Sequence, residues 1–386
     1  MSVAEREKKI LIFSAVYQPF SGFGLSIKEI TDRLPENEYY LVTNKFKAEE
    51  LNEEKIANIN VRRLGQGKKL DKYLYPFRAA SYALILHKNI KFDFVWSIGS
   101  YYAGLAALFF KYKTKTPYLF TLYSRASKNS IEKYIRFFNP LYKQIYCQPK
   151  LTQAISKRLG KYSRGLGNHG EIILLPEGID LNIYKNSLNS ELKQEIKKEL
   201  GISTDEMVII TVATAVLENS AIDLIKAMNF LVYKIGIAAK LVILGAELNE
   251  KNLRQLVREQ GVEDKVLFIA YADYKELASY IEMADIFCGP SVVEGFGSYF
   301  LEAMALGAPI IATSGNIPDF LVDGESGLFC ETPNPANIAL AIEKLLKDKE
   351  LYNKLASQGK DLIIKKYSWD IIAQQMKQMF NKMVEG

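Results

Sequence analysis

The sequence predicts an α/β protein made of two doubly wound, Rossmann-like domains that face each other across a cleft. Three observations support this expectation. The chain has 386 residues, which is too long for one ordinary hydrophobic core. Short apolar strands alternate with helical patterns, as in βαβ units that build parallel sheets. The alternation stops in the polar, highly charged segment 181–200 and then restarts, so we expect the domain boundary there.

The first domain is expected over residues 1–180. Its predicted strands lie in KKILIF, EYYLVTN, FDFVWSI, PYLFTLY, the start of LTQAISKRLGKYSR, and EIILLPEGID. Helices are predicted over 25–34 and 104–112, and from the end of the LTQA strand. The glycine loop SGFG, residues 21–24, stands between the first strand and the first helix. That order is a weak phosphate-binding signal by itself.

The second domain is expected over residues 190–368. Its predicted strands lie in MVIITVAT, KLVILGA, KVLFIAY, DIFCGPS and APIIATS. Helical patterns cover 221–235, 252–261, 276–284 and 337–367, and WDIIAQQMKQMF closes the chain as an amphipathic helix. Ligands of such sheets bind outside the carboxyl ends of the strands, so the cleft is the expected site.

Composition excludes several classes of protein. The longest apolar runs are far shorter than the roughly 20 residues that span a bilayer, and we expect no signal peptide. Three widely spaced cysteines fit neither a disulfide framework nor a zinc site, which favours a reducing cytoplasm. With two histidines in the chain, a histidine metal cluster is not expected.

Charge is distributed unevenly. Residues 1–170 carry a formal charge of +16 and residues 171–386 a charge of −10, within a net charge of +6. A basic half indicates contact with an anionic surface or substrate. Two segments of this half, 68–86 and 130–145, mix bases with aromatic residues. They predict either a surface that rests on anionic lipid or ordinary core helices with solvated charges. Nucleic acid fits the charge equally well but has no supporting motif, so we expect no nucleic-acid partner.

The stretch EGFGSYFLEAMALGAP, residues 294–309, carries two glutamates, Glu294 and Glu302. The helix after the first glutamate is predicted to start near Ser298, a suitable N-cap, and to stop at Gly307. Its free N–H groups would favour a phosphate. Two separate carboxylates suit a ligand with two polyol parts, because each accepts hydrogen bonds from vicinal hydroxyls. A sugar nucleotide has that form. The alternative is that Glu294 caps a loop and Glu302 is an exposed helix residue.

The residues around this stretch resemble the donor-site segment of retaining GT-B-fold glycosyltransferases of family 4, also called glycosyl transferases group 1. The family pattern is Glu, seven residues, Glu, a small-residue helix, Gly-x-Pro, a strand, a Pro-acid step and a Gly-x-x-Gly turn. Here the pattern corresponds to Glu294, Glu302, Gly307–Pro309, Pro318–Asp319 and Gly324–Gly327. The resemblance covers about residues 172–375 and is weaker over the first half.

The resemblance implies roles for several residues. Glu302 would hold the ribose hydroxyls of the donor, and Glu294 would contact the donor sugar and orient it for catalysis. The main-chain amides near sugar and diphosphate would belong to Gly295, Phe296, Gly297, Ser298 and Tyr299. Tyr271 would lie near the base, and Gly22 and Gly24 would face the donor. The final helix, about 370–386, would return to the first domain. No metal or other cofactor is implied.

Three departures from the family pattern stand out. Thr214 and Asn219 occupy the positions of an Arg and a Lys that clamp the diphosphate in the family. Each lost charge-assisted bond is worth roughly 1.5–3 kcal/mol. Tyr123 occupies the position of a histidine, and Gly245-Ala246-Glu247 stands where Gly-acid-Gly is usual.

The losses leave three readings open. Arg125 or Lys128 of the basic domain supplies the missing charge, or the donor carries less phosphate, or the chain is a pseudoenzyme that keeps the fold as a binding module. Other sugar-nucleotide chemistry on the same fold, such as epimerisation, is a further alternative. The expected function is retaining transfer of a hexose from a UDP- or GDP-linked sugar to a glycan or lipid-linked acceptor. We expect a cytoplasmic enzyme, peripheral to the inner face of the plasma membrane.

Overall fold

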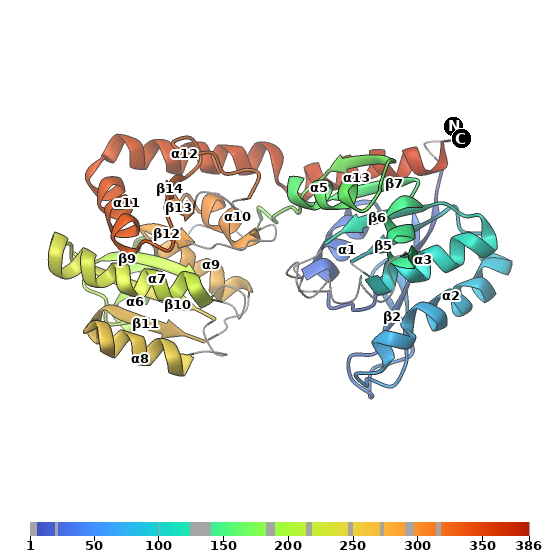
Figure 1. Ribbon diagram of the computed structural model, residues 1–386, viewed down its shortest axis with the longest axis horizontal. Coiled ribbons are helices and arrows are strands. Elements are labelled where there is room, and N and C mark those ends of the chain that lie inside the picture. Colours follow the sequence, from blue (N-terminus) through green and yellow to red (C-terminus); the bar gives the residue numbers. More distant parts are fainter. Residues whose placement is uncertain are drawn as a thin grey trace. The chain divides into compact units, whose positions relative to one another are not determined.

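The computed structural model describes residues 6–19, 22–99, 101–123, 140–182, 190–213, 218–245, 250–270, 274–289, 297–313 and 318–385. The chain folds into two compact units (Figure 1). The first unit contains Met1–Gly178 and Trp369–Gly386, and the second contains Ile179–Ser368. The chain therefore passes between the units twice, after Gly178 and after Ser368.

Among the described residues, the first unit contains an eight-stranded sheet in the order β3-β4-β2-β1-β5-β6-β7-β8. Its strands are β1 (Lys9–Phe13), β2 (Glu38–Asn44), β3 (Glu53–Ile56), β4 (Ile59–Leu64), β5 (Phe94–Ile98), β6 (Tyr118–Leu122), β7 (Leu151–Ala154) and β8 (Glu171–Leu174). The β3–β4 pair is antiparallel and the other neighbours are parallel. Strand order reverses direction between β1 and β5, which makes this pair the topological switch point.

Helices cover both faces of this sheet, which explains why its central strands are apolar along their whole length. The helices are α1 (Gly22–Arg33), α2 (Asp71–Ile90), α3 (Tyr101–Thr114), α5 (Lys157–Gly165) and α13 (Trp369–Val384). Helix α1 packs beside α13, and α2 packs beside α3 (Figure 1). Phe94 and Trp96 of β5 both meet Phe380 of α13, with ring centroids 5.3 Å apart. The last helix of the chain thus completes the core of the first unit.

The second unit contains, among its described residues, a six-stranded sheet in the order β11-β10-β9-β12-β13-β14. Its strands are β9 (Met207–Val212), β10 (Ala239–Leu244), β11 (Val266–Ile269), β12 (Ile286–Gly289), β13 (Ile310–Thr313) and β14 (Leu328–Cys330). All neighbours are parallel. The two parallel sheets confirm the predicted α/β fold class.

The helices of the second unit also lie on two faces. They are α6 (Ser190–Glu199), α7 (Glu218–Asn229), the π-helix η2 (Phe230–Ile235), α8 (Glu250–Gln260), the short η3 (Glu263–Lys265), α9 (Tyr274–Met283), α10 (Ser298–Ala305), α11 (Pro335–Lys347) and α12 (Lys349–Lys366). Helix α7 packs beside α8 and α11, whereas α10 packs beside α9 and α12. Figure 1 shows α12 and α11 joined at a sharp bend.

Several elements differ from the sequence-based expectation. The hairpin of β3 and β4 was not predicted, because the polar EEKI of β3 is only half-buried at an edge. Helix α6 lies inside the polar segment 181–200. The predicted helix 337–367 is two helices, because the Asp348 carboxylate accepts a hydrogen bond from the Leu351 N–H at 2.9 Å and starts a new helix.

A glycine fixes how the first unit closes on its last helix. A Cβ at Gly178 would lie 2.8 Å from Cδ2 and 2.9 Å from Cα of Trp369, so only glycine fits there. We expect Gly178→Ala to lower the free energy of unfolding of the first unit by about 1–3 kcal/mol, as overpacking does. Urea unfolding followed by tryptophan fluorescence measures this, since both tryptophans of the chain, Trp96 and Trp369, belong to that unit.

The matched control is Gly165→Ala, at the end of α5. An added Cβ there meets no heavy atom within 4 Å. This variant should unfold at nearly the wild-type urea concentration. Equal stability of the two variants would show that the Gly178 contact with Trp369 is not restrictive.

Candidate functional site

The candidate site follows from the strand order of the second unit. Strands β9 and β12 are neighbours, with Ile209 paired to Ile286 and Ile210 to Phe287. From β9 the chain continues to β10 on one side, and from β12 to β13 on the other. Open α/β sheets bind ligands in the crevice at such a switch point. The fold therefore starts two predicted segments from the same edge: the one that holds Thr214 and Asn219, and the one that holds Glu294 and Glu302.

Part of the predicted site lies outside the described residues. These positions are Thr214, Tyr271, Glu294, Gly295, Phe296, Arg125 and Lys128. Asn219 is assigned to α7, whose backbone begins at Glu218. Binding roles for all of these residues stay predictions.

The start of α10 differs from the expectation in one detail. Ser298 was predicted as the N-cap, but Gly297 occupies that position with a left-handed φ of 75°, and Ser298 is the first helical residue. The Phe300 N–H donates to the Gly297 carbonyl at 3.0 Å. A residue with a side chain would be strained there, and its Cβ would lie 2.9 Å from Cγ of Pro318. Gly307, at φ 80°, follows the helix as predicted.

Aromatic packing holds the start of α10 against the sheet. The Tyr299 ring stacks on Phe287 of β12 at 5.7 Å, and the Phe300 ring meets Phe287 edge-on at 5.6 Å. A Cβ at Gly289 would lie 2.6 Å from the Phe300 ring, so the end of β12 is shaped to receive that ring. The side chain of Tyr299 therefore serves packing, and its predicted contact with a ligand depends on its main-chain amide.

Glu302 is buried, with 7% of its surface exposed. The alternative in which Glu302 is an exposed helix residue is therefore wrong. Burying a carboxylate costs free energy unless hydrogen bonds or charges compensate. It lies one turn beyond Ser298 on the helix that leaves the switch point. The buried position of Glu302 therefore fits a carboxylate that binds a polar group, and does not fit a carboxylate that is hydrated at the surface.

The predicted glycine loop of the first unit is a helix start. Helix α1 begins at Gly22, which has a φ of 53°, three residues earlier than expected. A Cβ on Gly24 would lie 2.0 Å from the Gln18 carbonyl oxygen. The backbone at Gln18 thus leaves no room for a side chain at position 24. This contact is sufficient to require a glycine there, whether or not a ligand binds. Whether Gly22 and Gly24 face a donor stays a prediction.

Three polar side chains of the first unit that were not predicted as site residues surround one pocket. Ser26 of α1, Tyr123 after β6 and Glu177 after β8 all line it. Burial raises the pKa of Glu177 from 4.5 to about 8, and the hydrogen bond from Ser26 opposes this only in part. The signal in the sequence was the position of Tyr123 at the end of one predicted strand segment and of Glu177 in the exit turn of another. Neither spacing nor motif linked them to Ser26.

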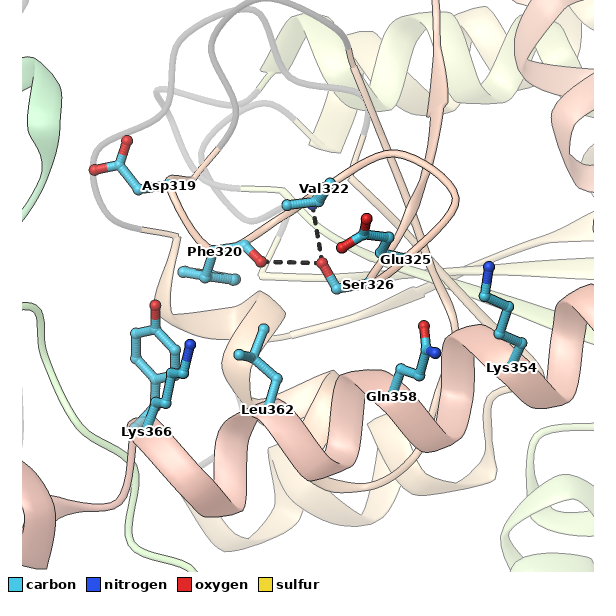
Figure 2. Close-up of a pocket in the computed structure, with 10 residues that line it drawn as sticks. Asp319, Phe320, Val322, Glu325, Ser326, Lys354, Gln358, Leu362 and Lys366 are labelled. Atoms are coloured by element: carbon cyan, nitrogen blue, oxygen red, sulfur yellow. Dashed lines mark hydrogen bonds between the residues drawn. The ribbon is translucent and has the colours of Figure 1, made fainter.

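A larger pocket of about 550 Å³ lies on the second unit between α12 and the loop before β14 (Figure 2). The loop contains the Pro-acid step and the glycine turn of the family pattern. The Ser326 hydroxyl donates to the Phe320 carbonyl at 3.0 Å and accepts from the Val322 N–H at 2.9 Å. Figure 2 shows both bonds crossing the loop. Within the second unit these pattern residues shape a loop, and none of the predicted donor residues that the structure describes lines this pocket.

The described residues contain no group of three His, Cys, Asp or Glu side chains placed to hold a metal ion. Within the same part of the chain, no helix combines the length and apolar character required to cross a membrane.

Comparison with known families matches both halves of the chain. The model of the family described as Glycosyltransferase Family 4 matches residues 20–183, and that of Glycosyl transferases group 1 matches residues 193–362. Together these two models cover most of both units. The resemblance predicted from the Glu294–Glu302 pattern is confirmed.

Two curated relatives and one solved structure show the extent of similarity. The α-monoglucosyldiacylglycerol synthase of Acholeplasma laidlawii is 26% identical over 277 residues, covering 71% of this chain and 68% of that protein. The N-acetyl-α-D-glucosaminyl L-malate synthase of Bacillus anthracis is 30% identical over 187 residues, covering 48% of each. The chain spans about half the length of the first curated relatives it matches.

The sucrose-phosphate synthase of Thermosynechococcus elongatus has the same fold. Its structure superimposes with a TM-score of 0.82 at 20% identity, over 98% of this chain and 99% of that one. The predicted GT-B class is confirmed by this likeness.

The geometry of α10 yields a test with two glycines. We expect Gly297→Ala to weaken nucleotide binding at least tenfold, because the strained φ and the Pro318 contact displace the helix start by more than a hydrogen bond tolerates. Gly307→Ala has a similar φ but no heavy atom within 4 Å of the added Cβ.

Calorimetric titration with UDP and GDP compares the two variants. The Gly307 variant should lose roughly 1–2 kcal/mol of folding stability and keep its affinity for the nucleotide. Equal affinity in both variants would contradict a ligand site at the start of α10.

Proposed function

Because the chain belongs to the family 4 (group 1) glycosyltransferases, a retaining family, we propose that it transfers a hexose from a nucleotide-diphosphate sugar to a hydroxyl acceptor. The observation that carries this proposal is the meeting of β9 and β12 at the switch point, from which α10 carries the buried Glu302. Helix start and carboxylate lie one turn apart. That separation suits a ligand with an anionic part next to a polyol.

The chemistry asked of the site is mainly electrostatic. In the proposed transfer the bond from the anomeric carbon to the diphosphate breaks while the acceptor oxygen bonds to that carbon. Negative charge grows on the leaving diphosphate. The first N–H groups of α10, at Ser298 and Tyr299, are fixed donors that stabilise such charge without rearranging. Glu294 is proposed to orient the sugar and Glu302 to hold the ribose.

The replacement of the two cationic residues that clamp the diphosphate in the family is the reason for a second candidate function. Thr214 and Asn219 carry no charge where the family has Arg and Lys. A chain that binds the nucleotide sugar without turnover would be a binding or interaction module on the same fold. Arg125 and Lys128 are the nearest basic residues after Tyr123 in the sequence and are candidates for a replacement cation.

For the acceptor, the proposal is a glycan or lipid-linked hydroxyl at the cytoplasmic face of a membrane. Four exposed apolar residues, Leu70, Tyr73, Leu74 and Phe77, follow the spacing of one helical face at the start of α2. Lys68, Lys69 and Lys72 are exposed beside them. An apolar face with a basic rim is complementary to an anionic bilayer surface. The relative that makes a glucosylated diacylglycerol adds support for a lipid acceptor.

The proposed reaction needs no metal or other cofactor, as the family resemblance implies. Titration with UDP, GDP and ADP identifies the base of the donor, and hydrolysis assays on the matching sugar nucleotides follow. Binding with turnover supports the transferase, and binding without turnover on a panel of lipid-linked acceptors supports the module.

Substitution of the two glutamates tests the donor site. We expect Glu302→Ala to weaken nucleotide binding by roughly ten- to a hundredfold, since a hydrogen bond to a charged group is worth about 1.5–3 kcal/mol. Glu294→Gln should lower the transfer rate roughly a hundredfold with little change in nucleotide affinity. Calorimetry and a donor-turnover assay measure the two effects. Glu331→Ala, at an exposed position of the same unit, should change neither. Wild-type behaviour of both site variants would reject the assignment.

Vesicle binding tests the membrane surface. We expect the wild-type chain to sediment with anionic vesicles at low salt and to dissociate as salt rises. Replacing Leu74 and Phe77 with serine should weaken binding at least tenfold, because each buried side chain contributes about 1.5–3 kcal/mol. The control is Leu340→Ser, which changes an equally exposed leucine on α11 of the second unit. Absence of wild-type binding at low salt, or equal binding by all variants, would contradict the proposal.

A further inference from the structure

The pocket of the first unit contains a chain of three side chains brought together from distant parts of the sequence. The Ser26 hydroxyl donates to a carboxyl oxygen of Glu177 at 3.4 Å, and its oxygen lies 3.1 Å from the Tyr123 hydroxyl. With Ser26 donating to Glu177, the Tyr123 hydroxyl donates to Ser26. The free space in the pocket is about 10 Å³, roughly the minimum for one water molecule.

The backbone around Glu177 is fixed on both sides. A buried series of hydrogen bonds runs from Trp96 Nε1 to Thr121 at 2.9 Å, and from the Thr121 hydroxyl to Gln153 Oε1 at 2.7 Å. Gln153 Nε2 then donates to the Leu175 carbonyl at 2.9 Å. Beyond Glu177, Gly178 lies against Trp369. The Glu177 side chain is therefore held toward α1 at the point where the chain leaves the first unit.

Among the described residues that line this pocket, none is a cation that compensates a negative charge on Glu177. Apart from Glu177 itself, the ionisable residue among the described lining of this pocket is Tyr123. The acids that α1 and α13 carry nearby in sequence, Glu29 and Asp370, both pair with Arg33. Burial raises the pKa of Glu177 to about 8, so its carboxyl is protonated at neutral pH.

The shift has a defined consequence for stability. The unfolded chain releases this proton near the ordinary pKa of 4.5, whereas the folded unit keeps it until about pH 8. Between these values the folded state binds more protons, so the stability of the first unit falls as pH rises and levels off above about 8.

We propose that Glu177 is a positioning residue whose protonated side chain holds the first turns of α1 through Ser26 and Tyr123, and whose ionisation loosens them. One long hydrogen bond cannot replace the hydration of a carboxylate. Although the carboxyl group lies in the pocket, the residue as a whole keeps part of its surface exposed, so an ionised side chain reaches water by rotating out of the pocket. That rotation breaks the contact with Ser26 and leaves the start of α1 less constrained.

The inference deepens the proposed function, because Gly22 and Gly24 at the start of α1 are the residues predicted to face the donor. It rests on that function only for its effect on transfer. The proposed control of the order of α1 by the protonation of Glu177 can be measured without a donor. The experiment therefore measures the ionisation of Glu177 and the hydrogen exchange of α1 first, and the transfer rate last.

Tryptophan fluorescence reports the ionisation directly, because Trp96 and Trp369 both line the pocket and the chain has no other tryptophan. In the wild type we expect a change in emission with a midpoint near the pKa of about 8. Glu177→Gln, which keeps the shape and the acceptor oxygen but cannot ionise, should lose this transition. Tyr123→Phe should retain it, which separates carboxyl from phenol titration.

Hydrogen exchange over residues 22–30 reports the helix. After division by the intrinsic rate at each pH, wild-type exchange should rise roughly tenfold across the same transition. It should stay slow and independent of pH in Glu177→Gln. Ser26→Ala should exchange fast at every pH, because the link to α1 is missing. Glu171→Gln, at an exposed glutamate of β8 in the same unit, is the matched control and should behave as the wild type.

Two results would overturn the inference: no transition in wild-type fluorescence, or an exchange step that persists in Glu177→Gln. If Glu177→Gln fails to fold, the pH dependence of fluorescence and exchange in the wild type, together with the exchange of Ser26→Ala, still tests the inference. The transfer rate is measured last. A loss of rate above the transition in the wild type, absent in Glu177→Gln, supports the link to the reaction. An exchange step without any effect on rate rejects that link, and absence of transfer at every pH counts against the proposed function alone.

Discussion

The pairing of β9 with β12 is the constraint on which the second unit depends. Parallel strands place all their carboxyl ends on one edge, and helices must then return over one face or the other. Where the direction of return changes, no helix covers the edge. Ile209 and Ile286 meet there, both buried, so the sheet core continues up to the opening. Helix α10 follows β12 in the chain, and the contact of the Phe300 ring with Gly289 and Phe287 holds it against the sheet.

Both units keep a carboxylic acid in a poorly hydrated place at such an edge, but the two acids differ. Glu302 sits on a helix that leaves the switch point. Glu177 lies beyond β8 in a pocket with the hydroxyl groups of Ser26 and Tyr123, and burial raises the pKa of its carboxyl to about 8. A buried acid is expensive when charged and inexpensive when protonated, unless a cation or hydrogen bonds compensate. The neighbours of each carboxyl group therefore decide whether it is charged, and for Glu177 burial raises the pKa to about 8.

The missing Arg and Lys define the main energetic problem of the proposed reaction. Two charge-assisted bonds to a diphosphate are worth roughly 1.5–3 kcal/mol each, and neutral Thr214 and Asn219 cannot replace them by charge. A helix N-terminus contributes roughly 0.3–1 kcal/mol at an exposed site and more in a dry one. In the proposed reaction, affinity for the diphosphate thus depends on how far the site excludes water.

Local patterns in the sequence were sufficient for much of the fold. Features that depend on near neighbours in the chain could be predicted without coordinates. They are the alternation of strands and helices, its restart after the polar segment, the glycine at position 307, and the spacing of Glu294 and Glu302. The predicted N-cap of α10 was one residue late and the predicted start of α1 three residues late, because helix ends depend on what the flanking backbone touches, such as Gln18 beside Gly24.

Only the tertiary structure decided which distant residues meet. Ser26 lies 97 positions from Tyr123 and 151 from Glu177, yet the sheet order brings all three to one pocket. It also decided that Glu302 is buried and that Gly178 must accommodate Trp369. The physical reason is that periodicity records which face of an element is apolar, whereas burial, pKa and hydrogen-bond partners depend on the neighbour that covers that face. The sequence by itself determined the elements and the family of the chain, and the packing of those elements determined the electrostatic state of its polar groups.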